Sequence, residues 1–485
     1  MQGTVFTWSS ALQEFLDPSN HITPLVELPN SLNPYLDDWV RIFLKLQTFL
    51  PLWNIKSISA WWMLNAVKQD LNDSKIDTLV ENSSGNTAFS LSVLGRAMWI
   101  PNMRARVSNE ITKGKLQLLQ LFWVQTVVNQ EQICPNPNDK RSWIYKAKDE
   151  WQQPWRYNPD QYHNTANPDI HYKITGKQLQ DQISSIDREY NFQIFCAWLG
   201  TTGTFIWISK YFKEQKSDFF SLWVVRKPNN PIPWPRTLHL LQQIGFDRKN
   251  YVNALQEISS KDAYETSLQL IRAGLVVWPS SGMALCGLFA QLQKMKSEGT
   301  LASKKWSHKF LSAVVVCPDG PYPYLDEYFK YCDIKHFPEV INAELLLEKN
   351  NSLAGIWNSN QQITCEECFT HLYTPESRKA FSGDSNINTL SLDSDIVLVD
   401  LRTQAEFNHV HLSWSMNIPF DEMKIGQFTL YKWKKIILIC AYGKKSDYLA
   451  NKLVKDGFNA FWIMGGMVEW SNKKLPRIVE NNCKL

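Results

Sequence analysis

Long apolar runs are absent from this sequence of 485 residues. No stretch approaches the roughly 20 consecutive apolar residues that a membrane-spanning helix needs, so we expect no association with a membrane. The first residues, Met1-Gln2-Gly3-Thr4-Val5, lack a basic region followed by a long apolar run, and we therefore expect no signal peptide. Both absences predict a soluble cytoplasmic protein.

An excess of one charge and a disulfide pattern are also missing. The net charge is only +4, and the basic residues are spread along the chain, so nucleic-acid binding gains little support. Nine cysteines scattered over this length do not form the disulfide framework of a small secreted domain. We expect reduced thiols.

Apolar residues, in contrast, are plentiful enough to bury a sizeable core. They make up 44% of the chain, and tryptophan is unusually frequent at 21 residues. The length predicts two to four domains. Polar residues gather at 348–352 and again at 357–362. We therefore predict a first domain of two lobes at 1–350, a linker at 351–362 and a second domain at 363–485.

A single lysine, Lys56, interrupts an apolar run between Phe49 and Met63. Burial lowers the pKa of a lysine, because the charged form loses its hydration. A neutral amine is a nucleophile that forms Schiff bases with aldehydes. The alternative is a lysine at the start of a helix whose stem is covered while its ammonium group reaches water. The stretch alone leaves both interpretations open.

Two helices and a strand are expected around a small polar turn after Lys56. The pattern predicts a helix over 57–71, a strand over 77–81 and a helix over 88–95. The turn between strand and helix reads Asn82-Ser83-Ser84-Gly85-Asn86-Thr87. Such a turn directs backbone N–H groups and a helix N-terminus at one point, which suits an anion. An ordinary turn before a helix is the alternative.

Several motifs in sequence order resemble the cysteine synthase and cystathionine β-synthase family of pyridoxal-phosphate enzymes. The resemblance covers roughly residues 20 to 345 and implies an α/β protein of fold type II, the tryptophan synthase β-like type, in which parallel sheets are flanked by helices. The motifs are Thr23-Pro24-Leu25, Lys45-Leu46-Gln47, Lys56 with the Ser83-Ser84-Gly85-Asn86-Thr87 turn, the run from Gln161 to Pro168, Gly200-Thr201-Thr202-Gly203-Thr204, Pro279-Ser280-Ser281-Gly282, and the strand from Val314 to Gly320.

The resemblance implies pyridoxal 5'-phosphate as the cofactor and assigns residues to it. Lys56 would bind the cofactor aldehyde and later take the substrate α-proton. Ser280 would face the pyridine nitrogen, where a hydroxyl does not force a proton onto the ring, and a weaker electron sink suits β-elimination. The implied cofactor-binding residues are Lys56, Asn86, Gly200, Thr201, Thr202, Gly203, Thr204 and Ser280.

A second set of residues would bind the substrate carboxylate through neutral donors. The resemblance implies Ser83, Ser84, Asn86, Thr87 and Gln161.

The sequence also departs from the family pattern near these residues. Ser57-Ile58 follow the lysine where the family has Asp-Arg, while Ala88 and Thr202 stand where glycine is usual. None of these changes removes a group with a covalent role, but they leave the amino-acid substrate open.

The second domain has two apolar strands and a cysteine at a strand end. The pattern predicts strands over 396–402 and 435–440, and the second runs into Ala441-Tyr442-Gly443-Lys444-Lys445-Ser446 and a helix. Converging N–H groups and two lysines favour the thiolate of Cys440. A buried, unreactive cysteine is the alternative. Cys365 and Cys368 have metal-like spacing without a second pair, so we expect two helix cysteines, with Thr364 as the helix N-cap, and no metal.

These features of the second domain resemble a rhodanese domain over roughly residues 363 to 478. The resemblance implies that Cys440 accepts sulfane sulfur as a persulfide, stabilised by loop N–H groups. Lys445 stands where the family often has arginine, which favours a protein or small persulfide over thiosulfate as the donor. The matching residues are Asp400-Leu401-Arg402-Thr403, Glu406-Phe407, His411, Asn417-Ile418-Pro419, Cys440, Gly443, Ser446, Gly465-Gly466 and Trp470.

The two resemblances together imply an enzyme of sulfur and amino-acid metabolism. It would catalyse β-elimination or β-replacement on serine, an O-activated serine or cysteine, with Cys440 as the sulfur carrier. The partners implied are a small amino acid and a sulfide or persulfide donor, and the family implies a homodimer. The alternatives are a cysteine desulfhydrase, a serine or threonine dehydratase, and a catalytically decayed binding or regulatory protein.

Overall fold

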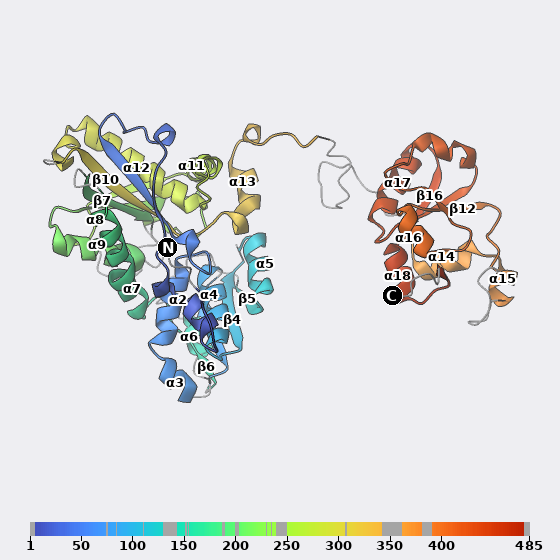
Figure 1. The fold of residues 1–485 in the computed structure, drawn as a ribbon, viewed down its shortest axis with the longest axis horizontal. Coiled ribbons are helices and arrows are strands. Elements are labelled where there is room, and N and C mark those ends of the chain that lie inside the picture. Colours follow the sequence, from blue (N-terminus) through green and yellow to red (C-terminus); the bar gives the residue numbers. More distant parts are fainter. Residues whose placement is uncertain are drawn as a thin grey trace. The chain divides into compact units, whose positions relative to one another are not determined.

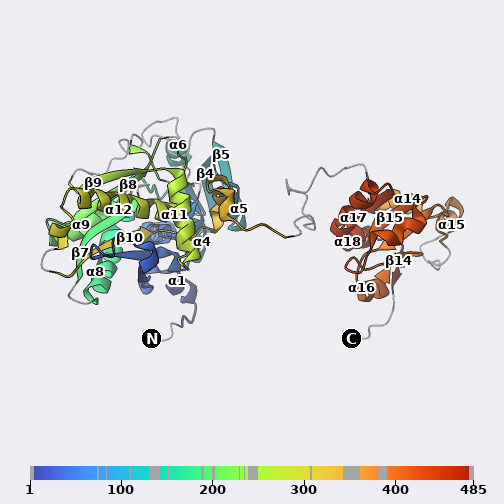
Figure 2. The same cartoon turned by 90° about the horizontal axis from the view of Figure 1, so that it is seen from above.

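The computed structural model describes most of the chain in two compact units, Met1–Phe337 and Pro338–Leu485, shown in Figures 1 and 2. The described residues are 5–73, 76–83, 85–109, 111–129, 143–150, 153, 155–186, 190–198, 203–228, 230–233, 235–238, 250–305, 308–341, 361–380 and 390–479.

A six-stranded sheet forms one lobe of the first unit, and its strands are parallel except for the edge pair β1 and β2. All eight residues of β10 are buried, which is typical of a parallel strand covered on both faces. In order across the sheet the strands are β1 (Leu25–Glu27), β2 (Val40–Leu46), β10 (Phe310–Cys317), β7 (Tyr190–Trp198), β8 (Phe220–Arg226) and β9 (Ala254–Ile258).

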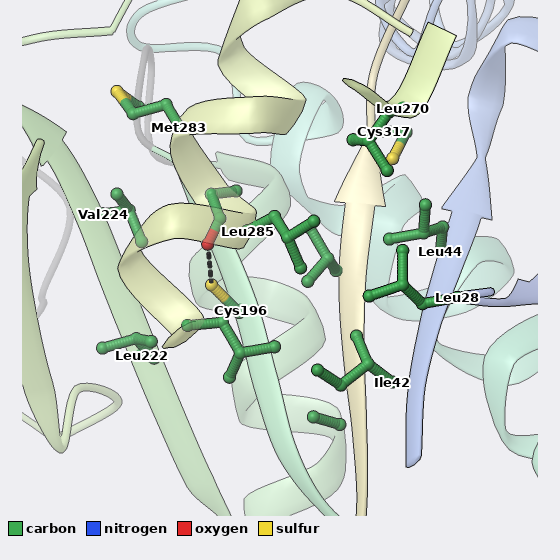
Figure 3. Close-up of a cluster of buried hydrophobic side chains, with 14 of the residues drawn as sticks. Leu28, Ile42, Leu44, Cys196, Leu222, Val224, Leu270, Met283, Leu285 and Cys317 are labelled. Carbon is green, nitrogen blue, oxygen red and sulfur yellow. Dashed lines mark hydrogen bonds between the residues drawn. The ribbon is translucent and has the colours of Figure 1, made fainter. Parts of the chain in front are cut away.

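Alternate residues of these strands enter two different cores. On one face, Ile42, Cys196 and Val224 pack under the long helix α12 (Pro279–Ser297), and Cys196 Sγ donates a hydrogen bond of 3.2 Å to the carbonyl of Ala284 (Figure 3). The opposite face packs against α8 (Lys177–Ser184) and α9 (Gly203–Gln215). Because neighbouring strand residues point to opposite faces, both sides of this sheet need a cover of helices.

A four-stranded parallel sheet forms the other lobe. Its strands in order are β5 (Val124–Asn129), β4 (Asn102–Ser108), β3 (Thr78–Asn82) and β6 (Arg156–Tyr157). The lobe's helices are α2 (Lys56–Asn65), α3 (Lys68–Asp73), α4 (Asn86–Ala97), α5 (Lys113–Leu121) and α6 (Trp143–Glu150). The first unit also contains α1 (Ala11–Leu16), α7 (Ala166–Ile170), a π-helix (His171–Gly176), α11 (Ser260–Arg272) and α13 (Leu325–Tyr331).

The second unit is a smaller α/β layer structure. Its parallel sheet has the order β11 (Gln362–Ile363), β16 (Asn459–Ile463), β15 (Lys435–Ile439), β12 (Ile396–Asp400), β14 (Met416–Asn417), and a separate pair joins β13 (Val410–His411) to β17 (Ile478–Val479). The helices are α14 (Cys365–Leu372), α15 (Pro375–Ala380), α16 (Gln404–His409), α17 (Lys444–Lys455) and α18 (Gly466–Asn472). Thr364 caps α14, as predicted, by accepting a hydrogen bond from the N–H of Glu367.

The α/β fold class is confirmed, and two helices differ by more than two residues in extent or are interrupted relative to the sequence-based prediction. The helix expected over 57–71 is interrupted after Asn65 and resumes at Lys68. The second helix begins at Asn86, so Asn86 and Thr87 lie on its first turn and not in the preceding loop. The predicted linker boundaries stay a prediction, because residues 342–360 lie outside the described residues. In the described part, no helix combines the length and the apolar character needed to cross a membrane.

Candidate functional site

Lys56 is the first residue of α2 and lies where that helix meets the end of β10. The N–H of Ile55 donates a hydrogen bond of 2.8 Å to the carbonyl of Pro318, and Asn54 pairs with Asp319 as an antiparallel bridge. Lys56 keeps partial exposure, but the surrounding protein displaces enough water to lower the pKa of its amine to about 8. About a tenth of this amine is therefore neutral and nucleophilic at pH 7, far more than for an ordinary lysine.

The start of α12 lies at the same strand end. The N–H of Trp278, the N-cap of α12, donates a hydrogen bond of 3.0 Å to the carbonyl of Asp319. Ser280 and Ser281 on the first turn are fully buried, and the Ser280 hydroxyl has no hydrogen-bond partner among the described residues. A buried unpartnered hydroxyl is costly unless a ligand completes it. The Ser280 hydroxyl therefore fits the pyridine nitrogen that the resemblance places beside it.

The start of α9 is connected to α2 through a buried histidine. His171 Nε2 lies 3.1 Å from Thr204 Oγ1 and 3.2 Å from Ser59 Oγ, and its Nδ1 lies 3.1 Å from Thr175 Oγ1. Burial lowers the pKa of His171 to about 3, and the nearby Lys56 charge adds to this effect, so the ring is neutral. Sequence reasoning missed His171; its place just after the Asn167-Pro168 motif was the available signal.

Part of the predicted phosphate loop can be placed. Gly203 begins α9, and a Cβ there would lie 3.2 Å from Pro168 Cβ, so glycine permits this close packing. The N-terminus of a helix with a threonine on its first turn is a favourable position for a phosphate. Gly200, Thr201 and Thr202 fall outside the described residues, as does Ser84, and their roles stay predictions.

Asn86 begins α4 and is hydrogen-bonded on both ends of its amide. Its Nδ2 donates to Asp319 Oδ2, and its Oδ1 accepts from Lys115 Nζ. The contact with Asp319 connects the start of α4 to the same strand end that positions Lys56 and Ser280. Three of the predicted cofactor-binding residues are thus gathered around one point.

The predicted substrate-binding residues form a chain of buried hydrogen bonds. Thr87 Oγ1 donates to Gln161 Oε1 at 3.0 Å, and Gln161 Nε2 donates to the carbonyl of Asn82 at 3.1 Å. Asn167 Nδ2 donates to the Gln161 carbonyl at 2.7 Å, and Ser83 Oγ accepts from the Gly85 N–H at 3.3 Å. The structure therefore brings Thr87 and Gln161 together, next to the turn that contains Ser83.

Glu81 is a fully buried carboxyl group beside this chain of hydrogen bonds. It accepts from the N–H groups of Asn82 at 2.9 Å and Gln161 at 3.3 Å. Burial outweighs these bonds and raises the pKa of Glu81 from 4.5 to about 8. The folded chain therefore holds a proton that the unfolded chain releases, so this contribution to stability is present below pH 4.5 and is lost as the pH rises towards 8.

We expect Glu81→Gln to change this pH dependence. The glutamine keeps the shape but cannot ionise, so its thermal unfolding temperature should fall less than that of the original chain between pH 5 and about pH 8.5. Thermal unfolding across this range is the measurement. Glu298→Gln, at an exposed position, is the control. Parallel curves for the Glu81 variant and the original chain would contradict the prediction.

In the second unit, Cys440 lies at the end of β15, before the helix α17. Its Sγ accepts from the N–H of Ser446 at 3.5 Å and lies 3.4 Å from Ser446 Oγ, which donates to the carbonyl of Gly443 at 3.1 Å. Cys440 is 3% exposed. The sulfur therefore lies at the N-terminus of α17, within reach of the Ser446 N–H.

Lys445 contacts an acidic and an aromatic side chain, which limits its ability to bind an anion at Cys440. Its ammonium lies 3.7 Å from Asp421 Oδ1 and 5.3 Å from the centre of the Phe420 ring. The charge is thus shared with a carboxylate, which weakens its pull on a thiosulfate dianion.

Gly466 holds the carbonyl end of the Cys440 strand in place. A Cβ on Gly466 would lie 2.2 Å from the Cys440 carbonyl oxygen, and the φ of Gly466 is +60°. That carbonyl accepts from the N–H of Met467 at 2.9 Å. Only glycine fits both the backbone angle and the close approach.

We therefore expect Gly466→Ala to destabilise the second unit and to displace Cys440. The matched control is Gly457→Ala, where φ is +82° and no atom lies within 4 Å of the new Cβ. The control should lose about 1 kcal/mol from backbone strain alone, and Gly466→Ala should lose more than about 2 kcal/mol. Chemical unfolding and the labelling rate of the Cys440 thiol are the measurements. Equal losses in the two variants would show that the crowding at Gly466 is harmless.

Two protein families match this chain. The model of pyridoxal-phosphate dependent enzymes matches residues 16–303, and the model of the rhodanese-like domain matches residues 386–473.

Individual relatives agree with the first match. A Bacillus subtilis protein named "Probable cysteine synthase" is 28% identical over 284 residues, which are 56% of this chain and 86% of that protein. The cystathionine beta-synthase of Saccharomyces cerevisiae is 27% identical over 281 residues, and the match spans 54% of each protein. The crystal structure of O-acetyl serine sulfhydrylase isoform 3 from Entamoeba histolytica has a similar fold, with a TM-score of 0.51 at 18% identity, covering 68% of this chain and 93% of that one.

Proposed function

We propose, since the chain belongs to the family of pyridoxal-phosphate dependent enzymes, that it catalyses β-elimination or β-replacement on serine, an O-activated serine or cysteine. The observation that supports this most directly is the buried Ser280 hydroxyl without a partner among the described residues, at the strand end that also positions Lys56. A hydroxyl at the pyridine nitrogen, where other chemistries use a carboxylate, favours loss of a β-substituent over transamination.

The residues of this chain divide the work around the cofactor. Bound pyridoxal phosphate supplies the electron sink that makes the substrate α-proton acidic. Lys56 would bind the cofactor aldehyde and then move the α-proton, a task suited to an amine whose pKa burial has lowered to about 8. Asn86 would donate to the ring oxygen, and Thr204 with the N-terminus of α9 would bind the phosphate. Thr87 and Gln161 bind the substrate carboxylate.

The rhodanese-like domain handles the sulfur in this proposal. The Cys440 thiolate attacks the outer sulfur of a donor persulfide, its bond to the donor sulfur breaks, and the donor leaves as a thiolate. No external oxidant or reductant is needed, because a persulfide is exchanged for a persulfide. Joining both domains in one chain raises the local concentration of the product of one at the other. The direction we favour is synthesis, with sulfur flowing from Cys440 into new cysteine. This second step needs a thiol reductant, which releases the outer sulfur of the Cys440 persulfide as sulfide and is itself oxidised to a disulfide.

A substrate panel tests the reaction class. Purified full-length protein loaded with pyridoxal phosphate is mixed with serine, O-acetylserine, cysteine or threonine, with and without sulfide, and both the cofactor absorbance and the products are followed. Cysteine formed only when sulfide is present supports synthesis. Sulfide released from cysteine indicates a desulfhydrase, and a keto acid formed regardless of sulfide indicates a dehydratase. No spectral change with any amino acid would leave the decayed, binding-only alternative.

Size-exclusion chromatography of the purified protein, which measures the size of the assembly, tests the proposed homodimer.

A further inference from the structure

A buried cluster of charged and polar side chains lies behind Asn86. Lys115 from α5 and Asp319 from the end of β10 are only 2% and 3% exposed, and Lys115 Nζ lies 3.9 Å from Asp319 Oδ2. The Lys115 ammonium also lies 4.6 Å from the centre of the Tyr324 ring, whose hydroxyl donates to Asp319 Oδ2 at 3.5 Å. The cluster joins the two lobes of the first unit, yet the proposed reaction assigns it no role.

Capping and close backbone packing at the start of α5 hold Lys115 in this position. Thr112 caps α5 by accepting from the N–H of Lys115 at 3.4 Å, and its hydroxyl donates to the carbonyl of Pro323 at 3.5 Å. Gly114 allows the loop after β10 to approach, since a Cβ there would lie 2.5 Å from the Pro323 carbonyl oxygen. The first turn of α5 is therefore packed directly on the chain that follows Asp319.

The hydrogen bonds of the cluster determine which way the Asn86 amide faces. Lysine can only donate, so the amide atom that it contacts must be the oxygen. An ionised aspartate can only accept, so the atom at Asp319 must be the nitrogen. The amide nitrogen carries two hydrogens, and Asp319 takes one. The other is left to point towards the ring oxygen of the cofactor.

Burial in the cluster also strengthens that donor. Burial lowers the pKa of Lys115 to about 8 and raises that of Asp319 to about 6, and their mutual attraction opposes both shifts. Both groups are thus charged near neutral pH. A cation at the amide oxygen polarises the amide, which makes its N–H groups better donors.

We propose that Lys115 and Asp319 are positioning residues that hold the Asn86 amide with one N–H facing the cofactor ring oxygen. This inference rests on the proposed function, because it requires pyridoxal phosphate in this site. The competing explanation is a buried ion pair that only joins the two lobes.

The experiment compares Lys115→Met, Asn86→Ala and the double variant in the full-length protein. Methionine keeps an apolar stem but cannot hold the amide oxygen. Lys113→Met, an exposed lysine two residues earlier on α5, is the matched control. The readouts are the dissociation constant for pyridoxal phosphate, the wavelength of its visible band, and the thermal unfolding temperature of the cofactor-free protein.

Lys115→Met should weaken cofactor binding about tenfold and shift the visible band, which corresponds to the loss of one good hydrogen bond. The double variant should be no worse than Asn86→Ala alone, because Lys115 acts through Asn86. A Lys115→Met protein that is less stable but binds the cofactor with unchanged affinity and wavelength would overturn this inference only. A wild-type protein without a visible band would overturn the proposed function as well.

A second, independent inference comes from the backbone. Among the described residues, eight that are not glycine have a positive φ, and six of them are tryptophan. A left-handed backbone conformation is strained for residues with bulky side chains, and glycine is the residue that usually adopts it. Trp39 contacts the Phe310 ring and Trp414 Nε1 donates to the Leu390 carbonyl. All six side chains are nevertheless exposed: Trp8 by 91%, Trp39 by 47%, Trp53 by 61%, Trp99 by 83%, Trp123 by 79% and Trp414 by 62%.

Helix ends provide a direct comparison. Gly274 follows α11 with φ +92°, and the next residue, Leu275, donates back to the Leu270 carbonyl at 2.9 Å. Trp99 follows α4 in the same way, with φ +69° and the Ile100 N–H donating to the Gly95 carbonyl at 2.8 Å. This is the helix-terminating motif whose left-handed residue is usually glycine.

Trp123 follows α5 in the corresponding position, with φ +57° and its N–H donating to the Gln120 carbonyl at 3.0 Å. Gly299 and Gly457 occupy it after α12 and α17, with φ of +69° and +82°. The same local structure is thus closed by glycine on three helices and by tryptophan on two.

We infer that these six tryptophans occupy glycine positions and that the protein made in its source organism carries glycine there. The chain contains 21 tryptophans but only 20 glycines. The codon UGA is read as tryptophan in some genetic codes and as glycine in others, so one reassigned codon would produce this pattern. The presence of exposed tryptophans on strained backbone then needs no explanation by a selective advantage.

Peptide masses of the protein from its source organism decide the matter, because tryptophan and glycine differ greatly in mass. Glycine at positions 99 and 123 supports the inference, and tryptophan there overturns the claim about the source organism.

In recombinant protein, Trp99→Gly and Trp123→Gly should each raise the unfolding temperature by about 2 °C. Trp433→Gly, at an exposed site without a positive φ, should not. A fall in stability at positions 99 and 123 would overturn the assignment of these positions to glycine.

Discussion

Lys56→Ala should abolish the visible absorption of the bound cofactor and lower any β-elimination or β-replacement activity by about 10³-fold or more. The reason is that Lys56 provides both the amine that binds the cofactor aldehyde and the base that moves the substrate proton. Its position at the start of α2, held by the bond from Ile55 to the Pro318 carbonyl, gives no neighbour on that turn a similar amine.

The measurement is an absorption spectrum of protein loaded with pyridoxal phosphate, followed by turnover with the substrates of the panel. Lys68→Ala, at an exposed lysine that begins α3, is the control and should keep both band and activity. The Lys56 variant should remain folded, because removing an amine that is poorly solvated costs the native state little. A Lys56→Ala protein with an intact band would remove the basis of the proposed function.

Cys440→Ser should abolish the transfer of sulfane sulfur to the second unit. The structure gives Cys440 an N–H donor from Ser446 and the N-terminus of α17, and a serine hydroxyl in that place does not ionise to a nucleophile at neutral pH. After incubation with a small persulfide, the wild-type peptide that contains Cys440 should gain the mass of one sulfur atom, and the variant should gain none there.

Cys286 is a suitable control because it is more accessible than Cys440. Burial by its surroundings nevertheless raises the pKa of the Cys286 thiol to about 11, so little thiolate exists there near neutral pH. Cys286→Ser should therefore leave sulfur uptake unchanged. Uptake at Cys286 equal to that at Cys440, or full uptake by Cys440→Ser, would contradict the assignment.

The sequence by itself determined the fold class, the cofactor and the two protein families, for a physical reason. An apolar run around Lys56, a strand followed by a polar turn and helix, and a cysteine at a strand end are local patterns, and each limits the chemistry that its residues support. Their order along the chain made the resemblance specific. The same local patterns placed the N-cap at Thr364 correctly, because capping depends on residues that are adjacent in sequence.

Only the tertiary structure revealed His171, Lys115 and Asp319 as neighbours of the predicted site. Lys115 lies 29 residues from Asn86, and Asp319 lies 233 residues from it, so no local pattern connects them. Their roles come from long-range packing, which also sets the burial that shifts the pKa values of Lys56 and Glu81. Element boundaries likewise needed the fold, because the first turn of α4 includes Asn86 and Thr87 only once that helix packs on its neighbours.

The tryptophans show the same division between sequence and structure. Their high number is visible in the sequence, but composition gives no reason for it. For six of them the backbone angles do, because each occupies a left-handed position of the kind that glycine usually fills. The sequence thus determined which chemical groups the protein has. The tertiary structure decided which of them lie in contact and which residues have a backbone conformation that is unusual for their side chain.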